Sequence, residues 1–441
     1  MGLVHMSAVE AAGAIRAGTM TSEELVRACL ERIKAIEERV GAWAYLDPDH
    51  ALKQARDADL ARREGRALGP LHGIPVGVKD IFDTHDMPTE SGTVLHAGRQ
   101  PAEDATVVAL LRQAGAIVMG KTVTTELAVY APGKTSNPHN PQRTPGGSSS
   151  GSAAAVAAFM VPLAIGTQTN GSVIRPASYC GVVGYKPSHG LISRYGVLQQ
   201  SRPLDQVGVF ARTVEDAALI AEQLMVFDDR DPDMRLRERP DLVQTVAEEP
   251  PVPPRLAFVR TPVWDQAEKD VKEAFVGLVE RLGERVKEVP LPDLFKDAIA
   301  VHRTIMEADL ARSFAPEYER GKDVLSLTLR EMIERGQKVL AGDYNRAVGQ
   351  IPVLHRSLEA IFEQYDALLT PATTGEAPVG LTSTGSPIFC TIWTLCGVPA
   401  ISLPILQGSS GMPIGAQLVG AKGADARLLR TARWLASHIR R

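Results

Sequence analysis

Two serine-bearing turns lie in the stretch from Gly146 to Pro176, which reads GGSSSGSAAAVAAFMVPLAIGTQTNGSVIRP. The first turn is a Gly/Ser run that contains Ser148, and the second is Asn170-Gly171-Ser172. Glycine lets a backbone adopt conformations that other residues resist, or lie close against a ligand. The second turn can therefore direct backbone N–H groups and one hydroxyl toward a common point.

The segment between the two turns predicts a compact helix–strand unit. Ala153–Met160 is rich in good helix formers, and the serines before it suit a helix start. Val161–Ile165 then reads as a short buried strand. We expect this unit to hold Ser148 and Ser172, 24 residues apart, in a fixed relation.

A lysine follows another apolar strand, at Lys79 after the β-branched run Ile74–Val78. The pKa of lysine is ordinarily about 10.4, which is too high for a base at neutral pH. Burial and nearby positive charge lower it by up to about 3–5 units. Its position makes Lys79 a candidate base, although pairing with Asp80 or Asp83, or simple exposure to solvent, would give it a structural role instead.

These residues carry a family resemblance. The chain resembles the amidase signature family, whose members hydrolyse or transfer amide nitrogen with a Ser–cis-Ser–Lys triad. The resemblance implies that Ser172 is the nucleophile, Ser148 the bridging serine after a cis peptide bond, and Lys79 the catalytic lysine. The likeness extends over most of the chain, through Ile74–Asp80, Thr124–Ala128, Cys180-Gly181, Leu369–Ala372 and Gly397–Ala400.

The same resemblance assigns the other parts of an amide-cleaving site. Ser148 would relay a proton between Lys79 and Ser172, and the backbone N–H groups of Thr169, Asn170, Gly171 and Ser172 would bind the oxyanion. For substrate binding we name Gly147, Arg175 and Trp393, with Phe389 and Leu395 as further residues that line the acyl pocket or belong to the core.

Three positions depart from the usual family pattern. Gln168 replaces a common acid, Asn170 occupies a usual glycine, and the arginine after the nucleophile is displaced to Arg175. The order Gln…Ser-Val-Ile-Arg-Pro resembles that of malonamidase-like enzymes, in which the arginine binds a substrate carboxylate. We hypothesise that Arg175 favours small anionic amides, and the alternative is that it pairs with an internal acid. A non-glycine at position 170 restricts the turn.

Two other motif matches are rejected. Gly115–Thr122 fits the phosphate-binding P-loop expression, but its central residues read as a strand rather than a flexible loop. Gly147–Gly151 fits the G-x-S-x-G nucleophile elbow with Ser149 as nucleophile, but the residues before it make a poor strand. The candidate histidine partners His189, His302 and His355 have no distinguishing context.

Composition is that of an ordinary globular protein, with 44% hydrophobic and 23% charged residues and a net charge of −4. No sustained basic run suggests a nucleic-acid surface, and no apolar run is long enough for a membrane span. The four cysteines lack metal-ligand spacing, and the loop histidines His85 and His96 are expected to be solvated. We therefore expect a soluble cytoplasmic protein with no metal or other cofactor.

Alternating helices and apolar strands predict an α/β architecture. The resemblance specifies one large domain, a mixed twisted sheet between helices, over residues 1–441. Within it we expect an N-terminal helical flank (1–65) and the signature core (66–226). An exposed charged and Pro-rich crossing (227–254) then leads to the remaining sheet with its covering helices (255–441).

The predicted function is hydrolysis of a small carboxamide to a carboxylate and ammonia through an acyl-enzyme. One alternative is the glutaminase subunit of a tRNA-dependent amidotransferase, although Phe389–Leu395 lacks the acid that such subunits use to hold glutamine. Another is a catalytically silent assembly protein of the same fold. The expected partner is a small amide, without nucleic acid or membrane, and the resemblance allows a homodimer.

Overall fold

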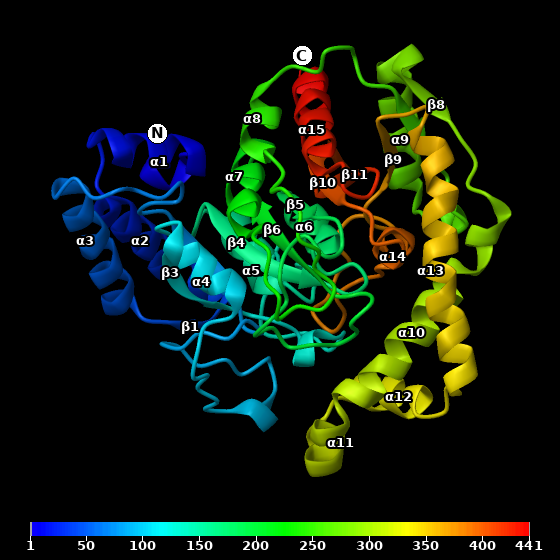
Figure 1. Cartoon of the computed structure of the whole chain (residues 1–441), viewed down its shortest axis with the longest axis horizontal. Coiled ribbons are helices and arrows are strands. Elements are labelled where there is room, and N and C mark those ends of the chain that lie inside the picture. Colours follow the sequence, from blue (N-terminus) through cyan, green and yellow to red (C-terminus); the bar gives the residue numbers. More distant parts are fainter. Residues whose placement is uncertain (1, 441) are drawn as a thin grey trace.

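Eleven strands form one mixed sheet that crosses the computed structural model from end to end, in the order β1-β3-β2-β4-β6-β5-β10-β11-β9-β7-β8 (Figure 1). The structure describes residues 2–440. The strands are β1 (Trp43–Leu46), β2 (Pro75–Lys79), β3 (Ile117–Thr122), β4 (Leu163–Gln168), β5 (Val183–Lys186), β6 (Gln206–Ala211), β7 (Leu256–Phe258), β8 (Val286–Glu288), β9 (Ala367–Pro371), β10 (Ala400–Gln407) and β11 (Pro413–Val419).

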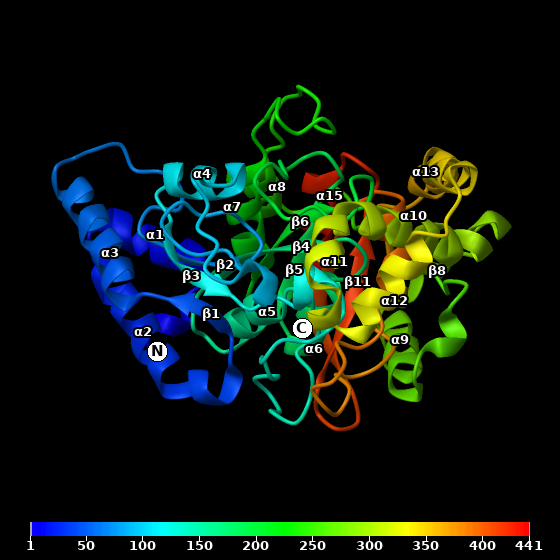
Figure 2. The same cartoon turned by 90° about the horizontal axis from the view of Figure 1, so that it is seen from below.

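Helices cover both faces of this sheet, as Figure 2 shows with α4, α7 and α15 on one side and α5 and α6 on the other. The helices are α1 (Ala8–Ala17), α2 (Ser22–Val40), α3 (Pro48–Arg63), α4 (Thr106–Gln113), α5 (Ser150–Ala157), α6 (Ile174–Cys180), α7 (Val214–Leu224), α8 (Leu242–Ala247), α9 (Lys269–Leu282), α10 (Ala298–Ser313), α11 (Ala315–Gly321), α12 (Leu327–Gly336), α13 (Ala341–Phe362), α14 (Ile388–Leu395) and α15 (Asp425–Arg440).

This arrangement confirms the predicted α/β class and the single sheet between helices. Strands from after the 227–254 crossing pair with strands from before it, since β10 hydrogen-bonds along β5. The α10–α13 helices gather at one side of the molecule, away from the N-terminal helices (Figure 1).

The centre of the sheet positions the two serine turns. β2 and β4 run parallel and side by side, with Val76 opposite Leu163. Parallel neighbours bring their carboxyl ends to one edge, so Lys79 at the end of β2 lies close to the turn that follows β4. All residues of both strands are buried, which explains their apolar, β-branched sequence.

Local sequence signals set the helix starts of the N-terminal flank. Thr21 and Glu24 form a capping box at the start of α2, and Asp47 caps α3 with Pro48 at its first position. The flank is not wholly helical, because Trp43–Leu46 pairs as the edge strand β1. That strand is only four residues long and shows no alternation in its sequence.

Most residues of the crossing at 227–254 are exposed, although a few are buried. Asp228 and Asp231 are buried, and α8 packs against α7 and α15. Asp231 accepts hydrogen bonds from Arg194, which ties the segment to the rest of the chain. Composition alone could not reveal these partners, which come from a distant part of the sequence.

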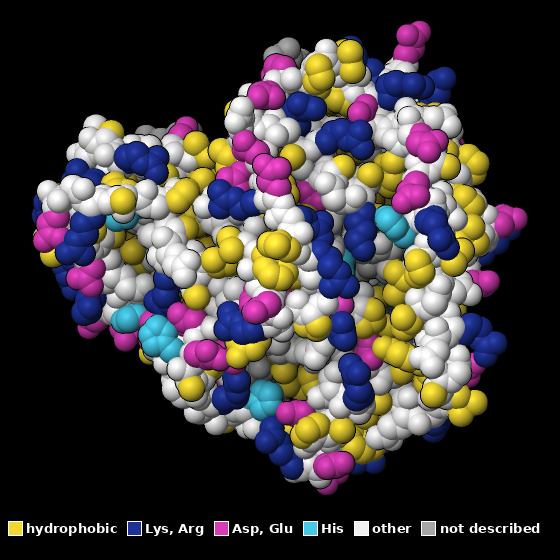
Figure 3. Space-filling model, viewed as in Figure 1, with side chains coloured by type: hydrophobic (Ala, Val, Ile, Leu, Met, Phe, Trp, Pro, Cys, Tyr) yellow, Lys and Arg dark blue, Asp and Glu magenta, His cyan; other side chains and the backbone are white. Residues whose placement is uncertain are grey.

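On the face in Figure 3, Lys and Arg side chains interleave with Asp and Glu and with apolar side chains. Among residues 2–440, none of the helices has both the length and the apolarity that a bilayer crossing needs.

Candidate active site

Lys79 is fully buried at the end of β2, and its amine faces hydroxyl groups rather than carboxylates. The Nζ atom lies 2.8 Å from Ser148 Oγ and 2.9 Å from Thr167 Oγ1. Burial holds the pKa of Lys79 well below its ordinary value, while the charge of Asp205 acts in the opposite direction. The neutral amine that a base requires is thus favoured by the surroundings.

The acids that could have paired with Lys79 serve other cations. Asp80 lies 3.4 Å from the amine of Lys121, a second buried lysine on the neighbouring strand β3. Asp83 accepts two hydrogen bonds from Arg99. Lys79 therefore has neither the acid partner nor the solvent exposure that a structural role would require.

Ser148 follows a cis peptide bond from Gly147, as the resemblance implies. Its neighbour Ser149 is held differently, because its hydroxyl lies 3.3 Å from both the backbone oxygen and the backbone nitrogen of Thr167. The rejected nucleophile elbow would need a strand directly before Gly147–Gly151, and the structure has none at that place.

Ser172 lies in the turn between β4 and α6 and is 7% exposed. Within residues 2–440 its hydroxyl has no hydrogen-bond partner, so the structure joins Lys79 to Ser148 directly but shows no bond from Ser148 to Ser172. The backbone N–H groups of residues 169–172 also have no acceptor in that part of the chain. A hydroxyl beside four backbone donors is an arrangement that can attack a carbonyl carbon and bind its oxygen.

The two departures at positions 168 and 170 each have a local structural role. Gln168 Oε1 accepts hydrogen bonds from the N–H groups of Val173 and Ile174 at the start of α6. The side chain of Asn170 donates to Tyr130 and accepts from Thr391. The φ angle of Asn170 is not positive, so the turn does not need glycine there.

Arg175 is fully buried and pairs with no acid in the described chain. Its Nε and Nη2 donate to the carbonyl oxygen of Gly147, and Nη1 donates to that of Gly385. The guanidinium therefore holds the peptide group that precedes Ser148. Its buried charge remains uncompensated, because Tyr130 offers only a ring face, with its centroid 5.9 Å away.

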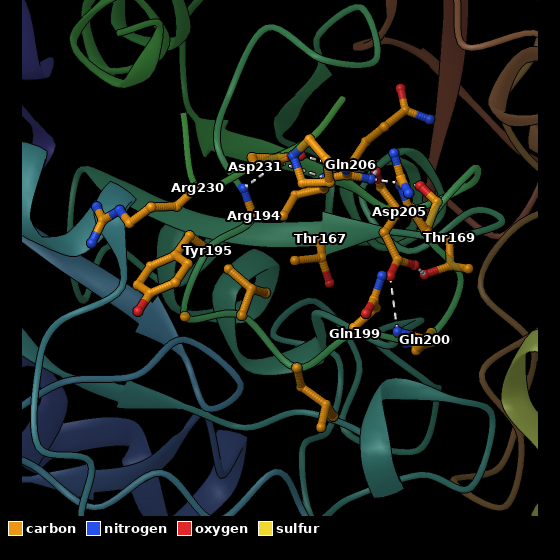
Figure 4. Close-up of a pocket in the computed structure, with 15 residues that line it drawn as sticks. Thr167, Thr169, Arg194, Tyr195, Gln199, Gln200, Asp205, Gln206, Arg230 and Asp231 are labelled. Atoms are coloured by element: carbon orange, nitrogen blue, oxygen red, sulfur yellow. Dashed lines mark hydrogen bonds and ion pairs between the residues drawn. The ribbon is translucent and has the colours of Figure 1, made fainter. Parts of the chain in front are cut away.

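Two cavities reach the 167–172 segment. The first, the Asp205 cavity, has a volume of about 330 Å³ and is lined by Thr167, Thr169, residues 194–200, 202, 205–206 and 230–232 (Figure 4). In Figure 4 the carboxylate of Asp205 points toward Thr169, whose hydroxyl donates to it over 2.6 Å. Asp205 also accepts from the N–H groups of Gln200 and Ser201, while burial raises its pKa to about 6.

The second, the His302 cavity, measures about 300 Å³ and lies between the turn and helices α10, α12 and α14. It reaches Asn170 and also Pro387, which packs so closely on Gly171 that a Cβ there would lie 2.8 Å from Pro387 Cβ. Its lining residues are Tyr130, Asn170, Ile299, His302, Arg303, Met306, Glu307, Thr328, Glu331, Met332, Arg335, Ser386, Pro387, Ile388 and Thr391.

The comparisons with known proteins agree with this geometry. The amidase family profile matches residues 24–429. The chain belongs to the amidase family. It is 37% identical to a glutamyl-tRNA(Gln) amidotransferase subunit from Acidothermus cellulolyticus, over 97% of this chain and 93% of that protein.

Solved structures of other proteins superpose on nearly the whole chain. The native peptide amidase of Stenotrophomonas maltophilia is 30% identical and has a TM-score of 0.84, with 99% of this chain and 97% of that chain covered. A vestigial protein complex linked to the origins of an s-triazine catabolic enzyme gives a TM-score of 0.92 at 27% identity, covering 98% of each chain.

Two sequence-based expectations are corrected by the structure. Trp393 is fully buried in the hydrophobic core and lines neither cavity, whereas Ile388 and Thr391 of the same helix line the His302 cavity. His96 is not simply solvated, because it lies 3.0 Å from Glu317. In an apolar helix such as α14, sequence alone does not distinguish a pocket-lining side from a core-facing side.

Sequence reasoning also missed Thr167, Asp205 and Tyr130, and it dismissed His302. Thr167 lies within the Gly146–Pro176 stretch, which was the only available signal; the other three residues come from other segments. The rejected P-loop residues do form a strand, β3, with Lys121 and Thr122 inside it. His85, Asp86 and Asp104 bring three metal-ligand atoms within 4.8 Å of one another, but Arg112 already hydrogen-bonds to both carboxylates.

Proposed function

We propose that this amidase family member hydrolyses carboxamides through an acyl-enzyme on Ser172, with Lys79 as the base and Ser148 as the proton relay. The observation that carries the proposal is a buried lysine amine without an acid partner, 2.8 Å from the hydroxyl that follows the cis bond. A neutral lysine is a competent base for a serine nucleophile.

The proposed reaction has two balanced stages. Ser172 Oγ attacks the amide carbon while its proton passes through Ser148 to Lys79, and the N–H groups of residues 169–172 stabilise the oxyanion. The C–N bond then breaks as the proton returns to the leaving nitrogen, which departs as ammonia. Water, deprotonated by the same relay, hydrolyses the ester and restores the Ser172 hydroxyl.

Within this chemistry we favour a glutaminase role inside an amidotransferase over the free-standing amidase that the sequence first suggests. Support comes from relatives named as subunits of glutamyl-tRNA(Gln) amidotransferase, which are 34–37% identical over nearly the whole chain. The absence of an acid in α14 does not oppose this role, because Glu307 and Glu331 line the His302 cavity from α10 and α12. A free-standing amidase is the second candidate, supported by the similarity to peptide amidase.

Arg175 supplies a finer hypothesis about the substrate. Its guanidinium is buried without a compensating anion, and such a charge is costly unless an anion joins it. Because the side chain lines neither cavity, we propose that its charge attracts a substrate carboxylate from a distance. The Arg175→Ala variant should raise KM for anionic amides far more than for neutral ones; equal effects on both would contradict the hypothesis.

The proposal is tested by labelling and by ammonia release. An active-site-directed fluorophosphonate should label Ser172 in the wild type and fail to label a Ser172→Ala variant. Ammonia release from glutamine and from small amides is then measured with and without the other subunits of an amidotransferase. Glutamine hydrolysis that needs those subunits supports the glutaminase role, hydrolysis without them supports a free-standing amidase, and no label with no ammonia indicates a silent assembly protein.

A further inference from the structure

His302 connects the turn that carries Ser172 with the cavity beside it. The ring belongs to α10 and is buried, and its Nε2 lies 2.9 Å from the carbonyl oxygen of Thr169. A carbonyl oxygen can only accept, so Nε2 carries the hydrogen and donates to Thr169. The ring therefore hydrogen-bonds to Thr169, the first residue of the 169–172 turn with its four backbone N–H donors.

The tautomer fixed in this way leaves the other ring nitrogen as an acceptor. Nδ1 of His302 has no hydrogen-bond partner within residues 2–440, and the ring lines the cavity. Burial lowers the pKa of His302 to about 4, so the ring stays neutral at physiological pH. An unpaired acceptor in a substrate-sized cavity needs a donor from whatever binds there.

Several neighbouring polar groups of the cavity are engaged with one another, while Arg303 and Glu331, which are not, are exposed. Asn170 bonds to Tyr130 and Thr391, and the Glu307 carboxylate accepts two hydrogen bonds from Arg335. Apolar side chains, among them Met306, make up much of the remaining wall. The unpaired Nδ1 is therefore a buried acceptor that can distinguish ligands by whether they carry a hydrogen-bond donor.

We propose that His302 is a specificity-determining residue whose Nδ1 accepts a hydrogen bond from a second N–H group of the substrate. The inference rests on the proposed amidase function and specifies its substrate class: carboxamides that carry an additional amine or amide N–H a few atoms from the scissile carbonyl. An amide without that N–H leaves Nδ1 unpaired in the complex and is disfavoured.

Matched pairs of amides test this preference directly. Malonamide, succinamide and glutaramide are compared with acetoacetamide, levulinamide and 5-oxohexanamide, in which a methyl group replaces one terminal NH₂ at nearly constant size. For the wild type, kcat/KM per carboxamide should be roughly tenfold higher for the diamide at the best chain length. No preference at any length would overturn the proposal.

Two variants separate the roles of the two ring nitrogens. His302→Gln places an amide nitrogen where Nε2 lies, so it keeps the donor to Thr169 but loses the acceptor. The ratio of diamide to keto-amide kcat/KM should fall to about threefold or less. His302→Asn retains an acceptor near Nδ1 and loses the grip on Thr169, so kcat should fall for both substrates while the preference persists.

His139→Gln is the matched control, because its Nε2 also lies 2.9 Å from a backbone carbonyl, that of Cys180, outside the cavity. It should leave the preference unchanged. A His302→Gln variant that keeps the wild-type preference overturns the inference, as does a His302→Asn variant that loses it. A wild type that releases ammonia without discrimination contradicts only this inference, whereas a wild type that neither releases ammonia nor labels at Ser172 contradicts the proposed function as well.

Discussion

The two cavities on either side of the Ser172 turn differ in how their charges are used. In the Asp205 cavity every arginine is already paired: Arg194 with Asp231 and Asp233, Arg202 with Asp233, and Arg230 with Asp228. In the His302 cavity, Arg303 and Glu331 take part in no ion pair within the described chain.

This difference indicates that the two cavities have different roles. Paired charges fix structure and leave little for a ligand, so the Asp205 side holds Thr169 and sets the electrostatic environment of Lys79. Unpaired charges and an unpaired ring nitrogen make the other side the one that we propose to bind substrate. Ser172 and its N–H donors lie in the segment that both sides position.

The largest effect is expected at the turn itself. Ser172→Ala should lower kcat by on the order of 10⁴-fold or more, because no nucleophile remains. Ser149→Ala, which removes only hydrogen bonds to the β4 backbone, should change kcat by less than about tenfold. Ammonia release by both variants checks this, and hydrolysis lost in the second variant alone would revive the nucleophile-elbow interpretation.

The next largest effect separates the two buried lysines. Lys79→Met should lower kcat by about 10³-fold or more. It should change the free energy of unfolding by only about 1 kcal/mol, since no acid is left unpaired. Lys121→Met should instead leave the buried Asp80 without its cation and lower the free energy of unfolding by about 3–5 kcal/mol. Denaturant melts and turnover of the folded fraction measure both. An active Lys79→Met enzyme would exclude the proposed base.

A smaller effect, on pH dependence, is expected from Asp205→Asn. Ionised Asp205 favours the protonated form of Lys79, so its removal lowers the pKa of Lys79 further and keeps the amine neutral to lower pH. The acid limb of the kcat/KM profile should therefore shift to lower pH. Because the pKa of Asp205 is about 6, the two profiles differ most above that pH, where the wild-type carboxylate is ionised.

The control for this shift is Asp233→Asn, whose carboxylate pairs with Arg194 and Arg202 instead. The acid limb should stay in place in that variant. A shift of equal size in both variants would mean that Asp205 has no particular influence on Lys79.

The smallest effect concerns the charges at the cavity rims. Arg303→Ala should raise KM roughly threefold for succinamate and lower it for 3-aminopropanamide, and both changes should shrink at high salt because exposed charges are screened. Arg202→Ala, on the Asp205 side, should leave both KM values unchanged. Equal responses to the two variants would remove the distinction between the cavities.

Much of the fold could be predicted because its signals are local. Capping residues mark the starts of α2 and α3, and apolar runs predicted β2 to within one residue and β4 to within three. Helix α14 and strand β5 were missed, since a short apolar segment reads equally well as helix, strand or core. The segment 227–254 is largely exposed, but its buried anchors Asp228 and Asp231 were not predicted, because its charges carry no sign of the arginines that they meet.

The sequence by itself determined the chemistry on offer: a strand-end lysine, two serine turns and the residue order that marks the family. Only the tertiary structure decided how that chemistry is used. It assigned Asp80 to Lys121 and left Lys79 without an acid, it turned Arg175 onto backbone carbonyls, and it placed His302 against Thr169. The physical reason is that pairing, burial and pKa depend on which side chains meet in space, and these partners lie tens to hundreds of residues apart along the chain.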